Sequence, residues 1–269
     1  HPFRCRLGED LAQATPERMR QIRGKDIAMI FQDPMSSLNP VFTVGRQVEE
    51  AIRVHNPDMS AAQIHERAAE MFKKVNIPDP EKSMKRYPHQ FSGGMKQRVI
   101  IAIALACSPQ LLIADEPTTA LDVTIQAQIL QLMRELKQKK DTSMIMITHD
   151  LGIVAETCDR VAVMYAGKII EEGNLEEVFN HTLHPYTEGL FNSLPNIKNR
   201  RSKLEPIRGL MPDPTNLPRG CAFAPRCNYA TDACRERRPE LVSFGGTHKA
   251  ACLAYENPDF HIERGKKNG

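Results

Sequence analysis

Two adjacent carboxylates follow an apolar run near the middle of the chain. Residues 111–114 are all apolar, and Asp115, Glu116 and Pro117 come directly after them. An apolar strand of an open α/β sheet carries its C-terminal end to the crevice where ligands bind. There, Asp115 could hold Mg²⁺ and Glu116 could orient or deprotonate an attacking water. Taken alone, the same residues also suit a solvated turn at a strand end.

A glycine-rich segment, Phe-Ser-Gly-Gly-Met at residues 91–95, precedes a helical stretch. Ser92 is a good N-cap, and Gly93 and Gly94 let an anion approach the backbone N–H groups closely. The positive end of the helix dipole adds to this attraction, so the segment could bind a phosphate. The alternative is an ordinary capped helix start without a ligand.

Gln32 and His149 each end an apolar run. A histidine in this place could donate a hydrogen bond to a phosphate oxygen or position a water. In isolation, both residues are more simply explained as structural.

The segments that must position these residues alternate between apolar strands and helices. We expect strands over 27–32, 111–114 and 144–148, and helices over 43–55, 60–76, 92–107 and 122–138. This alternation predicts an α/β fold whose sheet is covered on both faces. Two more strands, over 160–165 and 168–171, could be antiparallel additions at an edge. The pattern ends near residue 180, after which we expect a small appended domain.

The composition excludes several classes of protein. Of the 269 residues, 41% are hydrophobic and 26% charged, and the formal net charge is +3. The longest apolar run, 99–107, is too short to cross a bilayer, so we expect any membrane role to be peripheral. Interspersed charges and the lack of a typical leader give no reason to expect nucleic-acid binding or secretion.

Four of the seven cysteines, Cys221, Cys227, Cys234 and Cys252, lie in one Pro/Gly-rich segment. Such a local cluster in a reducing compartment suits a metal centre better than disulfides. Structural zinc sites favour shorter Cys-Cys spacings, so the pattern favours a 4Fe–4S cluster, with zinc as the alternative. Packed, reduced thiols without a metal are a third interpretation.

The motifs follow one another in a fixed order along the predicted α/β fold. With this order of motifs, residues 8–180 resemble the nucleotide-binding subunit of an ATP-binding-cassette (ABC) transporter. The matches are Gln32 to the Q-loop, 91–95 to the signature motif, 111–116 to Walker B, Ala120-Leu121-Asp122 to the D-loop and His149 to the switch histidine. Phe91 and Met95 depart from the usual Leu and Gln of the signature.

Two further segments resemble the oligopeptide and dipeptide importer branch of this family. They are Gln32-Asp33-Pro34 followed by residues 36–40, and His184-Pro185-Tyr186-Thr187. The resemblance implies a P-loop NTPase-like ABC nucleotide-binding domain over residues 1–180, with a mixed sheet covered by helices and a helical signature subdomain. A C-terminal extension, the small Cys-rich domain, would occupy residues 181–269.

The resemblance also implies a mechanism in which ATP lies between two such subunits, head to tail. Asp115 and Glu116 would serve this subunit's own nucleotide and Mg²⁺, with His149 on the γ-phosphate and Gln32 near the metal and water. Ser92, Gly93 and Gly94 would contact the partner's nucleotide, and Asp122 lies in the D-loop beside it.

The partners that the resemblance implies are two transmembrane permease subunits, a second related ATPase and, indirectly, an extracytoplasmic peptide-binding protein. The subunit would sit at the cytoplasmic face of the inner or plasma membrane and drive peptide import by ATP hydrolysis. The sequence does not identify the transported substrate, which could be a dipeptide, an oligopeptide or a metal chelate.

The chain departs from the family in one motif, because no G-x-x-x-x-G-K-[ST] occurs in its 269 residues. The family's P-loop precedes the segment that begins at Gly8, and Gly24-Lys25 is only a partial match. We therefore expect a truncated or frame-broken copy that binds ATP poorly and is inactive alone, with a degenerate site as the alternative.

Two other functions stay open at this point. One is a catalytically incomplete, metal-binding assembly partner, and the other is a soluble cassette ATPase acting on nucleic acid or ribosomes. The latter proteins usually carry two cassettes in one chain, whereas one is visible here.

Overall fold

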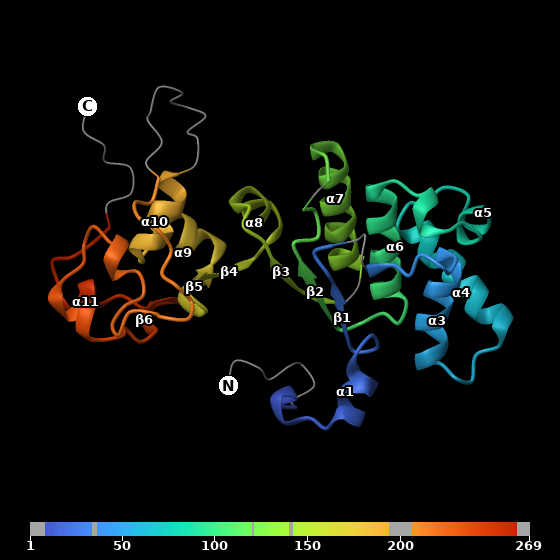
Figure 1. Cartoon of the computed structure of the whole chain (residues 1–269), viewed down its shortest axis with the longest axis horizontal. Helices are drawn as coiled ribbons and strands as arrows, with labels where there is room; N and C mark the ends of the chain where they lie inside the picture. The colour runs from blue at the N-terminus through green and yellow to red at the C-terminus, as the bar shows by residue number, and fades with distance from the viewer. Residues whose placement is uncertain (1–8, 34–36, 120, 140–141, 194–205, 263–269) are drawn as a thin grey trace. The chain divides into compact units, whose positions relative to one another are not determined.

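The computed structural model describes residues 9–262, apart from 34–36, 120, 140–141 and 194–205 (Figure 1). The chain forms two compact units, His1–Ile153 and Val154–Gly269, which we call the first and the second unit. Gly8, Ser36 and Ala120, which belong to motifs identified in the sequence, lie outside the described residues.

A three-stranded parallel sheet forms the centre of the first unit. Its order is β1 (Ile27–Ile30), β2 (Leu111–Asp115) and β3 (Ser143–Ile147). In register, Ala28 lies beside Leu112, which lies beside Met144. The three apolar runs predicted as strands are therefore confirmed. Because all three strands run in the same direction, their C-terminal ends meet at one edge of the sheet.

The first unit contains the four predicted helices, together with two short helices, over 16–22 and 80–84, that the sequence analysis did not predict (Figure 1). They are α1 (Pro16–Ile22), α3 (Val44–His55), α4 (Ala61–Lys74), α5 (Pro80–Met84), α6 (Gly93–Leu105) and α7 (Val123–Lys139), with 3-10 turns at Leu11–Gln13 and Pro88–Gln90. Ser60 and Gln63 form a capping box at the start of α4. Side chains of α3, α4, α6 and α7 pack with the buried face of the sheet in one core.

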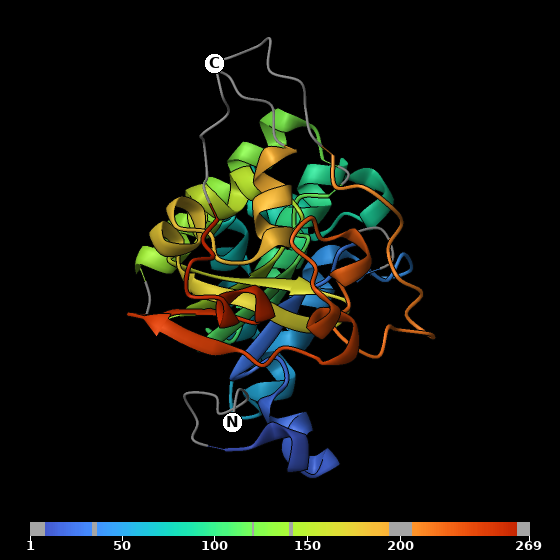
Figure 2. The same cartoon turned by 90° about the vertical axis from the view of Figure 1, so that its left-hand side faces the viewer.

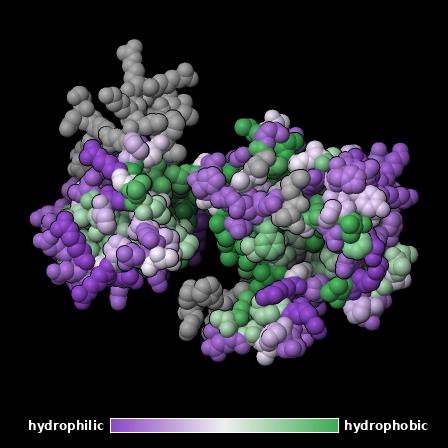
Figure 3. All heavy atoms as spheres, viewed as in Figure 1, coloured by the Kyte–Doolittle hydropathy of each residue, from purple (hydrophilic) through white to green (hydrophobic). Residues whose placement is uncertain are grey.

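The two faces of the parallel sheet differ in burial. Ala28, Ile30, Leu112 and Ala114 are buried against the helices. On the opposite face and just beyond β1, the described structure leaves Met29, Phe31, Ile145 and Ile147 between 37% and 55% exposed, and apolar surface is visible over these strands (Figure 3). Within the first unit, the described residues bury one face of the sheet and leave the other about half exposed, so the expected cover on both faces is incomplete there.

The second unit is built on a four-stranded antiparallel sheet (Figure 2). Its order is β4 (Arg160–Tyr165), β5 (Lys168–Asn174), β7 (His248–Ala250) and β6 (Val242–Gly245). The strands predicted over 160–165 and 168–171 thus pair with each other in a separate sheet and not at an edge of β1–β3.

Short helices complete the second unit. They are α9 (Leu175–Asn180), α10 (Pro185–Asn192) and α11 (Asp232–Glu236), with 3-10 turns at Ala224–Arg226 and Leu253–Glu256, and α8 (Leu151–Thr157) contains the boundary between the units. The core contains Val163, Tyr165, Ile170, Val178 and Phe223. None of the helices in the described part of the chain is both long and apolar enough to cross a membrane.

The buried carboxylate of Glu171 holds the backbone at the start of the His184-Pro185 motif. Glu171 is 0% exposed and accepts hydrogen bonds from the backbone N–H groups of Leu183 (2.7 Å) and His184 (3.0 Å). His248 Nε2 lies 2.8 Å from the same carboxylate. Glu171 therefore joins β5, β7 and the start of α10, because a buried carboxylate requires such partners.

Candidate functional site

Three of the predicted site residues meet around the carboxylate of Glu116. Gln32 Nε2 donates a hydrogen bond to Glu116 Oε2 (3.0 Å), and His149 Nδ1 lies 3.0 Å from Glu116 Oε1. Gln32 and His149 each lie two residues beyond their strands, β1 and β3, and Glu116 lies directly after β2. The parallel order of the strands therefore brings together residues that are far apart in the sequence.

Thr119 completes this group, and the sequence analysis missed it. Its Oγ1 donates a hydrogen bond to Glu116 Oε2 at 2.7 Å, the shortest contact to this carboxylate among the described residues. The signal that could have identified it is a hydroxyl residue three positions after an acid in a turn, because Ser and Thr often bond to neighbouring groups there. We call Gln32, Glu116, Thr119 and His149 the Glu116 group.

The electrostatics of the group keep Glu116 ionised. The hydrogen bond from Thr119 lowers the pKa of Glu116 most, followed by the hydrogen bond with His149, and the contact with Gln32 adds to them. Each of these interactions favours the charged carboxylate. His149 is largely exposed, with 77% of its side chain accessible. An ionised acid beside an exposed imidazole and an amide can orient a water and accept its proton.

The backbone at Glu116 has a strained conformation. Its φ is +44°, in the left-handed region that non-glycine residues rarely adopt. The N–H of Glu116 donates to the carbonyl of Ile147 (2.9 Å), and the N–H of Thr119 donates to the carbonyl of Glu116 (3.1 Å). Such strain persists where surrounding contacts impose it, and it is concentrated at functional sites.

Asp115 is the last residue of β2 and is half-buried beside Ile147 of β3. Side chains alternate along a strand, so Asp115 belongs to the same face as Ile113, opposite the buried Ala114. Its carboxylate oxygens match the ligands that Mg²⁺ prefers. The placement of Asp115 next to Glu116 at the C-terminal edge of the sheet therefore fits a metal ligand.

The glycine-rich segment begins α6, as predicted, and is separate from the Glu116 group. Ser92 is the N-cap, and its Oγ accepts a hydrogen bond from the N–H of Met95 (3.4 Å). Asp122 caps α7 in the same way, through the N–H of Ile125 (3.0 Å). The structure shows no hydrogen bond between Ser92 or Asp122 and the Glu116 group within the described residues.

The two glycines of this segment have different surroundings. A Cβ on Gly94 would lie 2.5 Å from Ile125 Cγ2 on α7, whereas a Cβ on Gly93 would come no closer than 3.8 Å to Leu121 Cδ2. Gly94 is therefore required by helix packing, whereas Gly93 could carry a methyl group in ordinary van der Waals contact with Leu121. Phe91 is buried in the core, which accounts for a large apolar residue there.

Comparison with known proteins identifies the family. Residues 5–119 match the ABC transporter family, and residues 170–234 match the oligopeptide/dipeptide transporter C-terminal region. The chain is 53% identical over 246 residues to the probable peptide ABC transporter ATP-binding protein y4tR of Sinorhizobium fredii, covering 91% of this chain and 73% of that protein. It is 50% identical over 248 residues to the oligopeptide transport ATP-binding protein AppD of Bacillus subtilis (92% and 75%). The chain belongs to the family of ABC transporter ATP-binding proteins.

Solved structures of ABC ATPases share the fold of this ABC protein. A dimeric ATP-binding cassette in a post-hydrolysis state with ADP and Pi superposes with a TM-score of 0.56 at 28% identity, over 62% of this chain and 71% of that one. The protein cbiO1 from Clostridium perfringens gives 0.55 at 31% identity (64% and 66%). The nucleotide-binding fold predicted from the motifs, with mixed α and β structure, is thus confirmed.

The four clustered cysteines of this ABC protein lie in the second unit and are all reduced. The N–H of Cys221 donates to the carbonyl of Cys234 (2.8 Å). Burial raises the pKa of the Cys227 thiol to about 12 and that of Cys252 to about 11, and the neighbouring cysteines add to both shifts. Within the described residues, no three His, Cys, Asp or Glu side chains are arranged to hold a metal ion.

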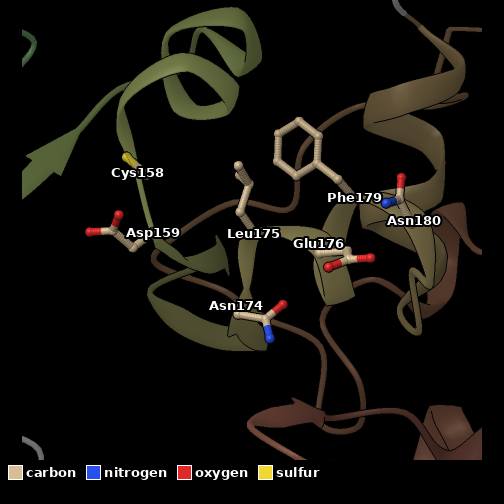
Figure 4. Close-up of a pocket in the computed structure, with 7 residues that line it drawn as sticks. All are labelled: Cys158, Asp159, Asn174, Leu175, Glu176, Phe179 and Asn180. Atoms are coloured by element: carbon tan, nitrogen blue, oxygen red, sulfur yellow. The ribbon is translucent and has the colours of Figure 1, made fainter.

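An open pocket of about 550 Å³ lies elsewhere in the second unit (Figure 4). Its lining residues are Cys158, Asp159, Asn174, Leu175, Glu176, Phe179 and Asn180. None of them belongs to the Glu116 group or to the start of α6. The pocket therefore has no part in the candidate nucleotide site.

Proposed function

We propose that this chain binds and hydrolyses ATP to drive peptide import through membrane permease subunits. The observation that carries the proposal is the Glu116 group, which gathers an ionised acid, an imidazole and an amide at the C-terminal edge of a parallel sheet. The similar proteins named above are peptide transport ATP-binding proteins. These relatives favour neither a soluble ATPase acting on nucleic acid or ribosomes nor an assembly partner without catalysis.

In this proposal Glu116 orients the attacking water and accepts its proton, because the hydrogen bonds that it receives keep it ionised. His149 is exposed enough to reach the γ-phosphate, and Gln32 holds the other carboxylate oxygen. Asp115 would hold Mg²⁺, which supplies positive charge to the phosphate oxygens. The contribution of the chain is positioning and electrostatic stabilisation.

Ser92, Gly93 and Gly94 would act on the nucleotide of a second, related ATPase subunit. Ser92 makes no hydrogen bond to the Glu116 group among the described residues and is free to serve a head-to-tail pair, in which each nucleotide is contacted by the α6 start of one subunit and the Glu116 group of the other. Asp122, at the start of α7, would lie beside the same interface. The dimeric cassette with ADP and Pi is a solved example of a paired assembly.

The phosphate cradle is the part that these 269 residues do not supply, since they contain no G-x-x-x-x-G-K-[ST]. Backbone N–H groups and a Lys in such a loop normally hold the β- and γ-phosphates. We propose that residues 1–269 alone bind ATP weakly, and that a version joined to a phosphate-binding segment hydrolyses it.

The test is ATP hydrolysis by residues 1–269 and by the longer version, each with Mg²⁺ and permease partners. In the longer version, Glu116→Gln should keep nucleotide binding and lower turnover about 10²–10⁴-fold, because the general base is lost. Glu66→Gln, an exposed change on α4, is the control and should leave turnover intact. Near wild-type turnover in Glu116→Gln would remove Glu116 from this role.

Location, partners and domain limits follow the same proposal. The chain would bind two permease subunits at the cytoplasmic face of the inner or plasma membrane, with peptide supplied by an extracytoplasmic binding protein. Residues 1–180 would form the ATP-binding domain, without a P-loop segment, and 181–269 the transporter-specific extension. The oligopeptide/dipeptide transporter C-terminal region matches residues 170–234, which include the first part of this extension, whereas the compact units divide between Ile153 and Val154.

We further propose that Cys221, Cys227, Cys234 and Cys252 hold a 4Fe–4S cluster, with zinc as the alternative. The support is that none of the four thiols forms a disulfide and that the other three raise the pKa of Cys227. Because the described residues contain no ready-made set of three ligands, binding would require the thiols to deprotonate and rearrange. Iron, sulfide and zinc analysis after purification without oxygen tests this, with Cys107→Ser as the control variant.

A further inference from the structure

Gln97 connects two parts of the candidate site that are distant in the sequence. It lies on α6, is 1% exposed, and its Nε2 donates a hydrogen bond to the carbonyl of Pro117 (2.7 Å). Pro117 is the residue directly after Glu116 and is itself buried. Without Gln97 the carbonyl of Pro117 would lose this partner, so the contact holds the turn that carries Glu116.

The same helix begins at Ser92, five residues before Gln97, which is a distance of about 7 Å along a helix. The start of α6 cannot move independently of its surroundings, because Gly94 packs directly against Ile125. Because Ser92 and Gln97 lie at the start of one continuous helix, a displacement of the Ser92 end would move Gln97 and, through its hydrogen bond, the turn at Pro117.

A second observation shows that Gln97 is more than a packing residue. Its Oε1 is buried and has no hydrogen-bond partner within the described structure. An unpaired buried acceptor lowers stability, and an apolar side chain of similar size would avoid that loss. The unpaired Oε1 of Gln97 thus lowers the stability of the fold, while its Nε2 holds the Glu116 turn through Pro117.

We propose that Gln97 is a positioning residue that couples the Ser92 end of α6 to the turn carrying Glu116. The proposal rests on the function proposed above, in which these two parts contact different nucleotides of a head-to-tail pair. Gln97 would then make each subunit's hydrolytic carboxylate respond to occupation of the opposite site. This communication runs within one chain, through one buried hydrogen bond.

A double-mutant cycle followed by amide hydrogen exchange tests the coupling in residues 1–269 without nucleotide. Ser92→Ala removes the cap of α6, and Gln97→Met removes the donor to Pro117 at similar side-chain volume. The reporters are the N–H groups of Thr119 and Leu121, which bond to the carbonyls of Glu116 and Thr118. Circular dichroism first establishes that each variant is folded. If Gln97→Met does not fold, Gln97→Asn replaces it, because the Asn side chain is one methylene too short to reach the carbonyl of Pro117.

We expect Ser92→Ala to accelerate exchange of both reporters about fivefold, the size of an N-cap contribution. In the Gln97→Met background the same change should have no further effect on them. Ser60→Ala removes the equivalent cap of α4 and should leave both reporters unchanged. Equal acceleration in both backgrounds, or none in either, would overturn the proposal. Because the cycle uses no ATP, a failure of the proposed hydrolysis would show separately.

Discussion

At the scale of single residues, the site is organised by the carboxylate of Glu116. Three side chains contact its two oxygens, and its backbone is held at a φ of +44° by hydrogen bonds to Ile147 and Thr119. A non-glycine residue in this conformation costs on the order of 1–3 kcal/mol. The fold accepts this cost at the position where an ionised acid follows the end of β2.

Replacement of Thr119 by Val should raise the pKa of Glu116, because the hydrogen bond that most favours its charged form is lost. A higher pKa leaves more of the carboxylate protonated in mild acid. The acid limb of the pH–rate profile for ATP hydrolysis should therefore move to higher pH in the version that contains a phosphate-binding segment. Thr119→Ser keeps the hydroxyl and should restore the wild-type profile. An unchanged profile in Thr119→Val would show that Thr119 does not tune Glu116.

At the scale of elements, α6 is the link between packing and the site. Its first turn holds Ser92 as the cap, its second turn holds Gln97, and its close approach to α7 depends on Gly94. The two adjacent glycines look equivalent in the sequence, yet Gly94 has no room for a side chain. The helix therefore needs glycine at position 94 for packing, whereas position 93 has room for a methyl group.

Gly94→Ala and Gly93→Ala should have opposite effects on stability. The new methyl group at Gly94 would overlap Ile125, and overpacking of this kind costs about 1–3 kcal/mol. At Gly93 the methyl group meets nothing closer than 3.8 Å, and Ala favours a helix over Gly by up to about 1 kcal/mol. Urea unfolding of the two variants measures the difference, and equal stabilities would contradict the assignment.

At the scale of the whole molecule, the exposed face of the parallel sheet stands out. Parallel sheets are normally covered on both faces, whereas Ile145 and Ile147 of β3 are about half exposed within the described structure. Contiguous exposed apolar surface promotes association. The buried face, by contrast, holds Leu112 at 0% exposure against the helices.

Ile145→Lys and Ile147→Lys should therefore reduce self-association of residues 1–269 while changing the thermal midpoint little. Each places a charge on surface that is already partly solvated, so little burial is lost. Leu112→Lys is the matched change on the other face, and it should unfold the first unit because an unpaired charge would be buried. Sedimentation velocity at several concentrations measures association, and unchanged association of both β3 variants would show that this face is not responsible.

The sequence by itself determined the elements and most of the residues of the site. Apolar runs without polar alternation identified β1, β2 and β3, and Ser92 marked the start of a helix as its N-cap. Since parallel strands end at one edge, Gln32, Glu116 and His149 could be expected to meet. Apolar runs and helix caps depend on residues that are neighbours in the sequence, so they can be recognised without the tertiary structure.

Only the tertiary structure decided which contacts complete the site. Thr119 belongs to the site because its hydroxyl donates a hydrogen bond to Glu116 within a strained turn. Gln97 belongs to it because α6 packs so that Gln97 bonds to Pro117, which is 20 positions later in the chain. The exposure of Ile145 and the separate antiparallel sheet of β4 and β5 likewise depend on which faces meet. The physical reason is that burial and hydrogen-bond partners are set by segments distant in the chain, which the pattern of any one segment does not contain.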